Sequence, residues 1–271
     1  MRTIEQAWEK ILDARARAQT LPEPAAGEQE SAETELLSVF RPLCVGGFGW
    51  VVGQLGQSLD GRIATPSGAS RYINGDNGLT HLHRLRAVAD AVVVGAGTAL
   101  EDNPRLTVRR VTGRQPVRVV VDRRDRLPRN HHLLADGDAP TLHLVAGDSI
   151  PEGRRSRPES GVTRIPCLDP DRVTIDPDRV LAVLACFDLA CVFVEGGGHT
   201  VSAFLTAGRL DRLHVMVAPM IIGSGYPAFT LPEIDLLHDA IRPEARVFNL
   251  GSDVLFDLDL TGSGTAHQRP E

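Results

Sequence analysis

Several features that mark other classes of protein are scarce or missing in this 271-residue chain. Lysine occurs only at Lys10, so 28 of the 29 basic residues are arginine. No run approaches the roughly 18 to 20 consecutive apolar residues of a membrane span. The first residues carry acids within a helical pattern and lack the apolar run of a secretory signal. The net charge of −6 provides no overall field for nucleic acid or an anionic membrane. We therefore expect a cytoplasmic protein that binds neither nucleic acid nor a membrane.

The four cysteines form no metal-binding pattern. Cys44, Cys167, Cys186 and Cys191 include no C-x-x-C pair, and no histidine follows them at ligand spacing. The H-x-E and P-C-x-x-C sequences of zinc-dependent deaminases are also absent. The sequence thus predicts no metal site and favours buried cysteines in a reducing compartment.

The apolar pattern changes along the chain. Ile4, Trp8, Ile11 and Leu12 share one face of an amphipathic helix, which could dock on its own domain or on a partner subunit. The stretch that follows is rich in Pro, Glu and Ala, as is typical of a linker. The predicted divisions are a helix at 1–19, a linker at 20–40, the main domain at 41–262 and a tail at 263–271.

In the main domain, β-branched apolar runs alternate with helical stretches. This alternation predicts an α/β fold with a mostly parallel central sheet flanked by helices. A C-terminal antiparallel hairpin is predicted over Val247–Leu260, and a surface excursion over Arg154–Pro177. The predicted strands are Val45–Leu55, Ala91–Val94, Val117–Val121, Leu142–Val145, Cys191–Val194 and Leu213–Val217, and the predicted helices are Leu79–Val88, Asp178–Phe187 and Val201–Leu205.

Three glycines follow an apolar strand that ends in Glu195, and a helix starts near Thr200. Glycine lets a backbone approach a ligand closely, and the free N–H groups of a helix start attract phosphate. Ligands of open α/β sheets sit beyond the carboxyl ends of the strands. The segment is therefore either a nucleotide-phosphate site or an ordinary tight turn, and it lacks the G-x-G-x-x-G fingerprint.

A second buried strand ends at Gly95 and is followed by Gly97, Thr98 and Asp102. A hydroxyl and a carboxylate beyond a glycine turn can contact phosphate or ribose, although such turns are common without a ligand. Arginine forks suit phosphate, yet most surface arginines are simply solvated. The arginines that flank this strand in sequence are Arg84, Arg86, Arg105, Arg109 and Arg110.

Taken together, these segments resemble the reductase domain of the riboflavin-biosynthesis deaminase-reductase proteins, which are relatives of the dihydrofolate reductase fold. The resemblance runs from about Leu43 to Asp259, with its stretches in family order. They are Ser58-Leu-Asp-Gly-Arg-Ile-Ala64, Ser70-Arg-Tyr-Ile73, Leu85-Arg-Ala87, Asp90-Ala-Val-Val-Val-Gly95, Gly97-Thr98, Asp102-Asn-Pro104, Leu106-Thr-Val-Arg109, Gln115-Pro-Val-Arg-Val-Val-Val-Asp122, Glu195-Gly-Gly197, and Ala218-Pro219 with Gly223.

The resemblance implies NADPH as hydride donor and a ribosylaminopyrimidine 5′-phosphate as substrate, whose ribose is reduced to the ribityl chain. It also implies a homodimer. The implied cofactor residues are Gly56, Tyr72, Thr98, Asp102, Gly197, Gly198, His199 and Thr200. The implied substrate residues are Ser70, Arg86, Leu106, Arg109 and Glu195, with Glu195 and Gln54 at the catalytic centre.

The chain departs from the family pattern in three places. Gln54 stands where the family usually has lysine, and Arg123 stands where it has serine. A short helix and linker occupy the place of the deaminase half. These departures leave open two alternatives, namely an NADPH reductase of another pterin-like or ribosylated heterocycle and a non-catalytic nucleotide-binding module.

Overall fold

The computed structural model describes residues 4–23, 31–44, 49–70, 73–172 and 174–262. The chain divides into two compact units, Met1–Trp50 and Val51–Glu271. In the described part, no helix is long and apolar enough to cross a membrane. The predicted tail at 263–271 lies outside the described residues.

The first unit contains two helices, α1 (Ile4–Ala16) and α2 (Ala32–Phe40), and a short 3₁₀ helix, η1 (Arg41–Leu43). Helix α1 lies within the predicted helical segment, with Trp8 and Ile11 buried; Ile4, predicted on the same face, is exposed. The Trp8 ring meets the Phe40 ring edge-on, with 5.5 Å between the ring centroids.

Helix α2 overturns part of the predicted linker, which is wrong for residues 32–40. A capping box begins this helix: the Thr34 N–H donates to Ser31 Oγ at 3.2 Å, and the Ser31 N–H donates to Thr34 Oγ1 at 2.8 Å. These bonds satisfy backbone groups that a helix start otherwise leaves unpaired. Leu36, Val39 and Phe40 are then buried on one side of the helix.

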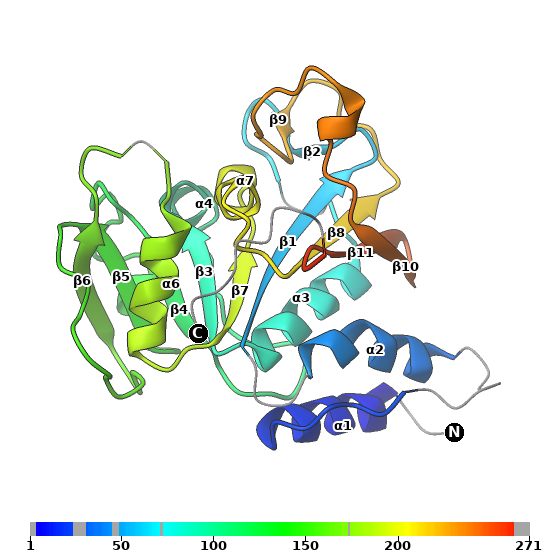
Figure 1. Ribbon diagram of the computed structural model, residues 1–271, viewed down its shortest axis with the longest axis horizontal. Helices are drawn as coiled ribbons and strands as arrows, with labels where there is room; N and C mark the ends of the chain where they lie inside the picture. Colours follow the sequence, from blue (N-terminus) through cyan, green and yellow to red (C-terminus); the bar gives the residue numbers. More distant parts are fainter. Residues whose placement is uncertain (1–3, 24–30, 45–48, 71–72, 173, 263–271) are drawn as a thin grey trace. The chain divides into compact units, whose positions relative to one another are not determined.

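The second unit is built on a nine-stranded sheet in the order β10-β11-β8-β1-β7-β3-β4-β5-β6. The pairs β1–β8, β3–β7, β3–β4, β4–β5 and β5–β6 are parallel, whereas β8–β11 and β10–β11 are antiparallel. This confirms the mostly parallel sheet and the C-terminal hairpin (Figure 1). The strands are β1 (Trp50–Ser58), β3 (Ala91–Gly95), β4 (Val117–Val121), β5 (Thr141–Ala146), β6 (Val162–Leu168), β7 (Cys191–Glu195), β8 (Arg212–Ala218), β10 (Glu244–Leu250) and β11 (Asp253–Asp259).

Every residue of β3 and of β4 is buried, because helices cover a parallel sheet on both faces. Helix α3 packs on β7, α4 on β3 and β4, α6 on β6, and α7 on β3 and β7. These helices are α3 (Asp76–Val88), α4 (Ala96–Asp102), α6 (Pro177–Cys186) and α7 (Gly198–Thr206), with the short α5 (His132–Ala135) and η2 (Leu237–Asp239).

Two predictions about local structure need correction. The predicted surface excursion Arg154–Pro177 contains the edge strand β6, whose buried side chains are Ile165, Cys167 and Leu168. An edge strand tolerates Pro166 and polar outward side chains, so its sequence does not look like that of the buried strands. The strand predicted from residue 45 is observed from Trp50 to Ser58, and residues 45–48 lie outside the described residues.

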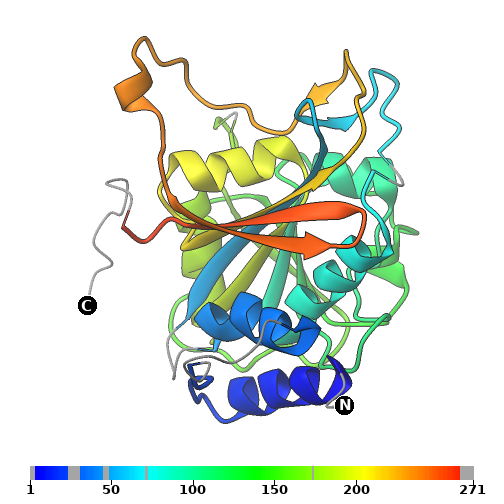
Figure 2. The same cartoon turned by 90° about the vertical axis from the view of Figure 1, so that its right-hand side faces the viewer.

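A second, two-stranded sheet joins distant parts of the chain. Strand β2 (Arg62–Ala64) pairs antiparallel with β9 (Tyr226–Pro227). The Asp60-Gly61 turn therefore does not lead back into the large sheet. It leads instead into a small sheet at the carboxyl end of β1 (Figures 1 and 2).

Candidate active site

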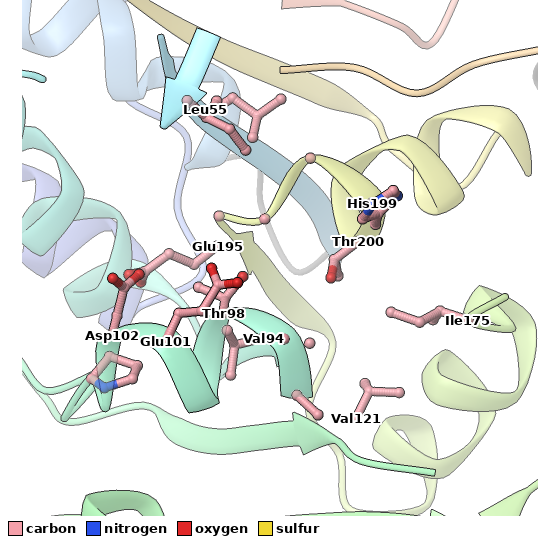
Figure 3. A pocket seen from close by; sticks show the side chains of 18 of the residues that line it. Leu55, Val94, Thr98, Glu101, Asp102, Val121, Ile175, Glu195, His199 and Thr200 are labelled. Carbon is pink, nitrogen blue, oxygen red and sulfur yellow. The ribbon is translucent and has the colours of Figure 1, made fainter. Parts of the chain in front are cut away.

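A cavity of about 1090 Å³ lies at the carboxyl ends of strands of the large sheet. Its walls come from the end of β1, helix α4, the loop after β4, the start of α7, and β9. Figure 3 shows Thr98, Glu101 and Asp102 on α4 near Glu195, with Thr200 on the start of α7. The predicted site residues that line the cavity are Gln54, Gly56, Ser70, Thr98, Asp102, Leu106, Arg109, Glu195, Gly197, Gly198, His199 and Thr200.

Two predicted site residues do not join this set. Tyr72 lies outside the described residues. Arg86 is 4 % exposed and does not line the cavity, because its guanidinium lies behind Glu195. Arg86 Nε donates to Glu195 Oε2 at 2.7 Å, and Arg86 Nη2 donates to Glu195 Oε1 at 2.5 Å. The remaining guanidinium nitrogen, Nη1, donates to the Thr107 carbonyl at 3.0 Å.

The Arg86–Glu195 pair fixes the carboxylate at the cavity wall. Both oxygens of Glu195 accept from one planar guanidinium, which is the strongest geometry for such a pair. Each oxygen keeps a second lone pair for a group in the cavity. All three nitrogens of Arg86 thus donate to the protein, whereas Glu195 remains accessible from the cavity.

Arg109 is the cation beside this pair that faces the cavity. Its Nη1 donates to Thr107 Oγ1 at 2.6 Å, and its backbone N–H donates to His83 Nδ1 at 2.9 Å. Burial, followed by the charges of Arg86 and Arg105, lowers the pKa of Arg109, and Glu195 opposes this only in part. Excess positive charge at a partly buried place favours a bound anion.

His83 shares this positive environment. Burial, followed by the charges of Arg86, Arg109 and Arg110, lowers its pKa to about 3. His81, two residues earlier, instead contacts His214, with Nε2 and Nδ1 2.9 Å apart. The two histidines therefore face different partners.

The glycine bend between β7 and α7 carries positive φ angles of +60° at Gly196 and +69° at Gly197. A Cβ at Gly197 would collide with Thr98 Oγ1. A Cβ at Gly198 would come within 2.7 Å of the Ala228 carbonyl oxygen. Gly197 and Gly198 are therefore required by the packing of the protein on itself, whereas Gly196 meets only Thr98 Cγ2, at 3.8 Å.

Two non-glycine residues just after α4 have positive φ angles, Asn103 at 42° and Leu106 at 54°, and Leu106 lines the cavity. Leu106 is 1 % exposed, so its side chain is packed despite the unfavourable backbone. Strained residues of this kind cluster at functional sites. Next to them, Ser70 Oγ donates to Asp102 Oδ1 at 3.2 Å and joins the two predicted binding residues.

Gln54 lies on β1 and is 4 % exposed, with its side chain at the cavity wall. Its backbone carbonyl accepts from the Gly196 N–H at 3.3 Å, which ties β1 to the glycine bend. Its side-chain amide has no hydrogen-bond partner among the described residues. Because Gln54 lines the cavity, its amide can donate to or accept from a ligand there.

The loop after β4 brings three arginines to the cavity, Arg123, Arg124 and Arg126. Arg123 Nη1 donates to the Pro170 carbonyl, and Arg126 Nε lies 4.0 Å from Asp122 Oδ1. The sequence singles out Arg123 only. Arg124 and Arg126 could have been found by extending the rule for strand ends by a few residues.

Among the described residues, one group could hold a metal ion: Asp122, Asp125 and His143. Arg164 Nη2 pairs with Asp125 Oδ2 at 2.6 Å, and Arg126 approaches Asp122. These cations already balance the two carboxylates. The contacts of this cluster are therefore those of an ion-pair network.

Comparison with known proteins places this cavity in a family context. A family model described as the RibD C-terminal domain matches residues 49–255. The chain belongs to this family. It is 37 % identical over 226 residues to a protein of Methanothermobacter thermautotrophicus named 2,5-diamino-6-ribosylamino-4(3H)-pyrimidinone 5′-phosphate reductase, covering 79 % of this chain and 99 % of that protein.

Longer relatives of the RibD family match over part of their length. The riboflavin biosynthesis protein RibD of Bacillus amyloliquefaciens is 34 % identical over 190 residues, 70 % of this chain and 50 % of that protein. The structure of Acinetobacter baumannii RibD superposes with a TM-score of 0.64 at 26 % identity, covering 84 % of this chain and 62 % of that one. The chain thus spans about half the length of the Bacillus protein but nearly all of the archaeal one.

Proposed function

We propose that this member of the RibD C-terminal domain family is an NADPH-dependent reductase of the riboflavin pathway. Its substrate is a ribosylaminopyrimidine 5′-phosphate, whose ribose it reduces to the ribityl chain. The observation that carries the proposal is one cavity in which a glycine-rich helix start, a fixed Glu195 carboxylate and the electropositive Arg109 lie together. The archaeal relative's name and the family membership support the same chemistry.

The start of α7 is the part of the cavity that fits the diphosphate of a dinucleotide. The N–H groups at the beginning of a helix have no intrahelical partners and attract anions. His199 and Thr200 stand at this position, and Thr98 lies across the bend. We infer that these groups hold the diphosphate, with Gly56 and Asp102 at the cofactor's other contacts.

The cavity arginines after β4 support NADPH over NADH. Arg123, Arg124 and Arg126 supply positive charge at one place on the wall. Arginine forks are suited to a phosphate monoester. We infer that these residues bind the 2′-phosphate that distinguishes the two cofactors.

The other part of the cavity fits the pyrimidine nucleotide. Arg109 is the better candidate for the 5′-phosphate, because the fork of Arg86 is already occupied by Glu195 and Thr107. Glu195 is held to accept hydrogen bonds from the ribose hydroxyls or the pyrimidine. Arg86 then acts as a positioning residue for Glu195, which revises its predicted place in the phosphate site.

The nicotinamide cofactor supplies the hydride when it is bound. The residues of the chain orient the opened ribose so that C1′ faces the place of hydride delivery. Glu195 and Gln54 border that place from β7 and β1. Leu106, which is 1 % exposed, adds an apolar side chain to the cavity wall.

The decisive experiment mixes purified chain with NADPH and each of two substrates. They are the 2,5-diamino-pyrimidinone ribosylamino phosphate and its deaminated uracil counterpart. We expect NADPH oxidation with formation of the ribityl product from at least one of them. NADPH binding without turnover of either would favour the second candidate function described next. No affinity for a nicotinamide cofactor would leave only a non-catalytic module.

The second candidate is an NADPH reductase of another ribosylated or pterin-like heterocycle, and Gln54 favours it. A neutral, unpartnered amide at this wall can both donate and accept, whereas the lysine that the family resemblance leads one to expect can only donate. Rescue of a reductase-deficient riboflavin auxotroph is expected of the first function and not of the second.

The resemblance also leads us to propose a cytoplasmic homodimer. Light scattering tests the assembly state.

A further inference from the structure

The carboxylate of Asp60 joins two segments of the cavity rim that are far apart in sequence. Ser58 Oγ donates to Asp60 Oδ1 at 2.6 Å, and the Ile222 N–H donates to the same oxygen at 3.1 Å. The Gly223 N–H donates to Asp60 Oδ2 at 2.6 Å. The Ser58 hydroxyl, followed by the Ile222 N–H, lowers the pKa of Asp60 to about 2. Asp60 is therefore ionised throughout the neutral range.

Further bonds connect the same two segments around this carboxylate. The Leu59 N–H donates to the Met220 carbonyl at 2.8 Å, and the Ala228 N–H donates to the Gly61 carbonyl at 3.0 Å. Arg62 Nε donates to the Gly223 carbonyl at 2.9 Å. We call residues 220–230 the rim segment; its strand β9 lies beside β2 in both views (Figures 1 and 2).

The rim segment covers the start of α7. Tyr226, Pro227 and Thr230 line the cavity. The carbonyl oxygens of Pro227 and Ala228 lie so close to Gly198 that a Cβ there would be 2.9 Å and 2.7 Å from them. The Thr230 N–H also donates to Ser202 Oγ, within α7, at 2.9 Å. The position of the rim segment thus sets the shape of the cavity above the glycine bend.

We propose that Asp60 is a positioning residue that holds the rim segment against the start of α7 and thereby sets the affinity for the dinucleotide. The identity of that ligand rests on the proposed function. The chemistry explains the need for a carboxylate. Three donors converge on two oxygens of one side chain, and the ionised form accepts all of them.

The test compares Asp60→Asn with Asp60→Glu. An amide presents one oxygen and one NH₂ group, so at least one donor loses its acceptor. We expect the Ile222 and Gly223 amides of Asp60→Asn to exchange hydrogen about tenfold faster without ligand. We also expect the Kd for NADPH to rise about tenfold, as loss of a charge-assisted bond implies, with kcat within about twofold of wild type. Asp60→Glu keeps two acceptor oxygens and should recover part of the affinity.

Two controls sharpen the comparison. Asp235→Asn makes the same change of charge at an exposed position between β9 and η2, just after the rim segment. It should alter neither amide exchange at Ile222 and Gly223 nor NADPH affinity. Ser58→Ala removes the hydroxyl that donates to Asp60 but leaves its carboxylate. We expect a smaller change of the same kind, which provides a second test should Asp60→Asn fold poorly.

The outcomes separate this proposal from the proposed function. Unchanged amide hydrogen exchange at Ile222 and Gly223 in Asp60→Asn would show that Asp60 does not hold the rim segment. Faster exchange with unchanged NADPH affinity would overturn the positioning role while leaving the proposed function intact. A wild-type chain that binds no nicotinamide cofactor would instead overturn the proposed function, and amide exchange would still decide whether Asp60 holds the rim.

Discussion

Replacing Arg86 with lysine tests the buried ion pair at the centre of the cavity wall. Arg86 donates two hydrogen bonds to Glu195 and one to the Thr107 carbonyl. Lysine keeps the charge, but its ammonium group cannot match the carboxylate in parallel and also reach Thr107. The Thr107 carbonyl would keep only the long 3.5 Å bond from Arg109 Nη1, and a buried acceptor without a good partner costs about 1–3 kcal/mol. Glu195 faces the cavity, where water can reach it, so we count one such loss rather than two.

We therefore expect Arg86→Lys to lower the free energy of unfolding by about 1–3 kcal/mol and the Tm by about 2–4 °C per kcal/mol. The misplaced Glu195 should lower kcat/KM by about 10- to 100-fold, mostly through kcat. Thermal unfolding and steady-state NADPH oxidation measure the two effects. A direct phosphate contact from Arg86 predicts instead a raised substrate KM with little change in stability.

A double-mutant cycle makes the test strict. Arg86→Lys and Glu195→Gln should be non-additive in stability by about 1 kcal/mol or more, because the residues share two hydrogen bonds. Arg109→Lys is the matched control, since Arg109 bonds to Thr107 and not to Glu195. Arg109→Lys should raise the substrate KM, and its effect on stability should simply add to that of Glu195→Gln. Additive effects of the Arg86 and Glu195 changes would refute the reasoning.

Three further predictions concern separate parts of the site. His83 is neutral when folded, with a pKa of about 3, whereas the unfolded imidazole takes up a proton below about pH 6.5. The contribution of His83 to the free energy of unfolding should thus fall by about 1.6 kcal/mol from pH 6.5 to pH 5, and urea denaturation of His83→Gln should show a shallower fall. Gly197→Ala should lower the free energy of unfolding by more than Gly196→Ala does. Backbone strain alone costs about 1 kcal/mol at Gly196, whereas at Gly197 the added Cβ would also collide with Thr98. Equal losses of Tm in the two variants would contradict this. Arg124→Gln should raise the Kd for NADPH about two- to fivefold and leave that for NADH unchanged, and an equal change in both would remove Arg124 from the 2′-phosphate site.

The buried strands could be predicted because their side chains carry the signal. Val117–Val121 is β-branched at four of its five positions and forms β4 with the predicted bounds. The polar edge strand β6 lacks this signal, because only one of its faces is covered. Helix α2 begins at a capping box of two hydroxyl residues, Ser31 and Thr34. It was not predicted because the surrounding stretch is rich in Pro and Glu, as is typical of a linker.

The site could be predicted where it depends on the ends of strands. Parallel strands bring their carboxyl ends together, so Glu195 at the end of β7 and Thr98 after β3 meet in one cavity. Contacts across long separations could not be predicted. Arg86 reaches Glu195 across 109 positions, and Asp60 reaches Ile222 across 162. Such pairs follow from the packing of α3 on β7 and the pairing of β9 with β2, and they leave no local pattern in the sequence.

The most direct test of the central claim is a crystal structure of the chain with NADP⁺. We predict the diphosphate on the N–H groups at Gly198 and His199, the 2′-phosphate beside Arg124, and the nicotinamide between Gln54 and Glu195. A dinucleotide bound elsewhere, or a cavity filled by the protein's own side chains at saturating NADP⁺, would contradict the account.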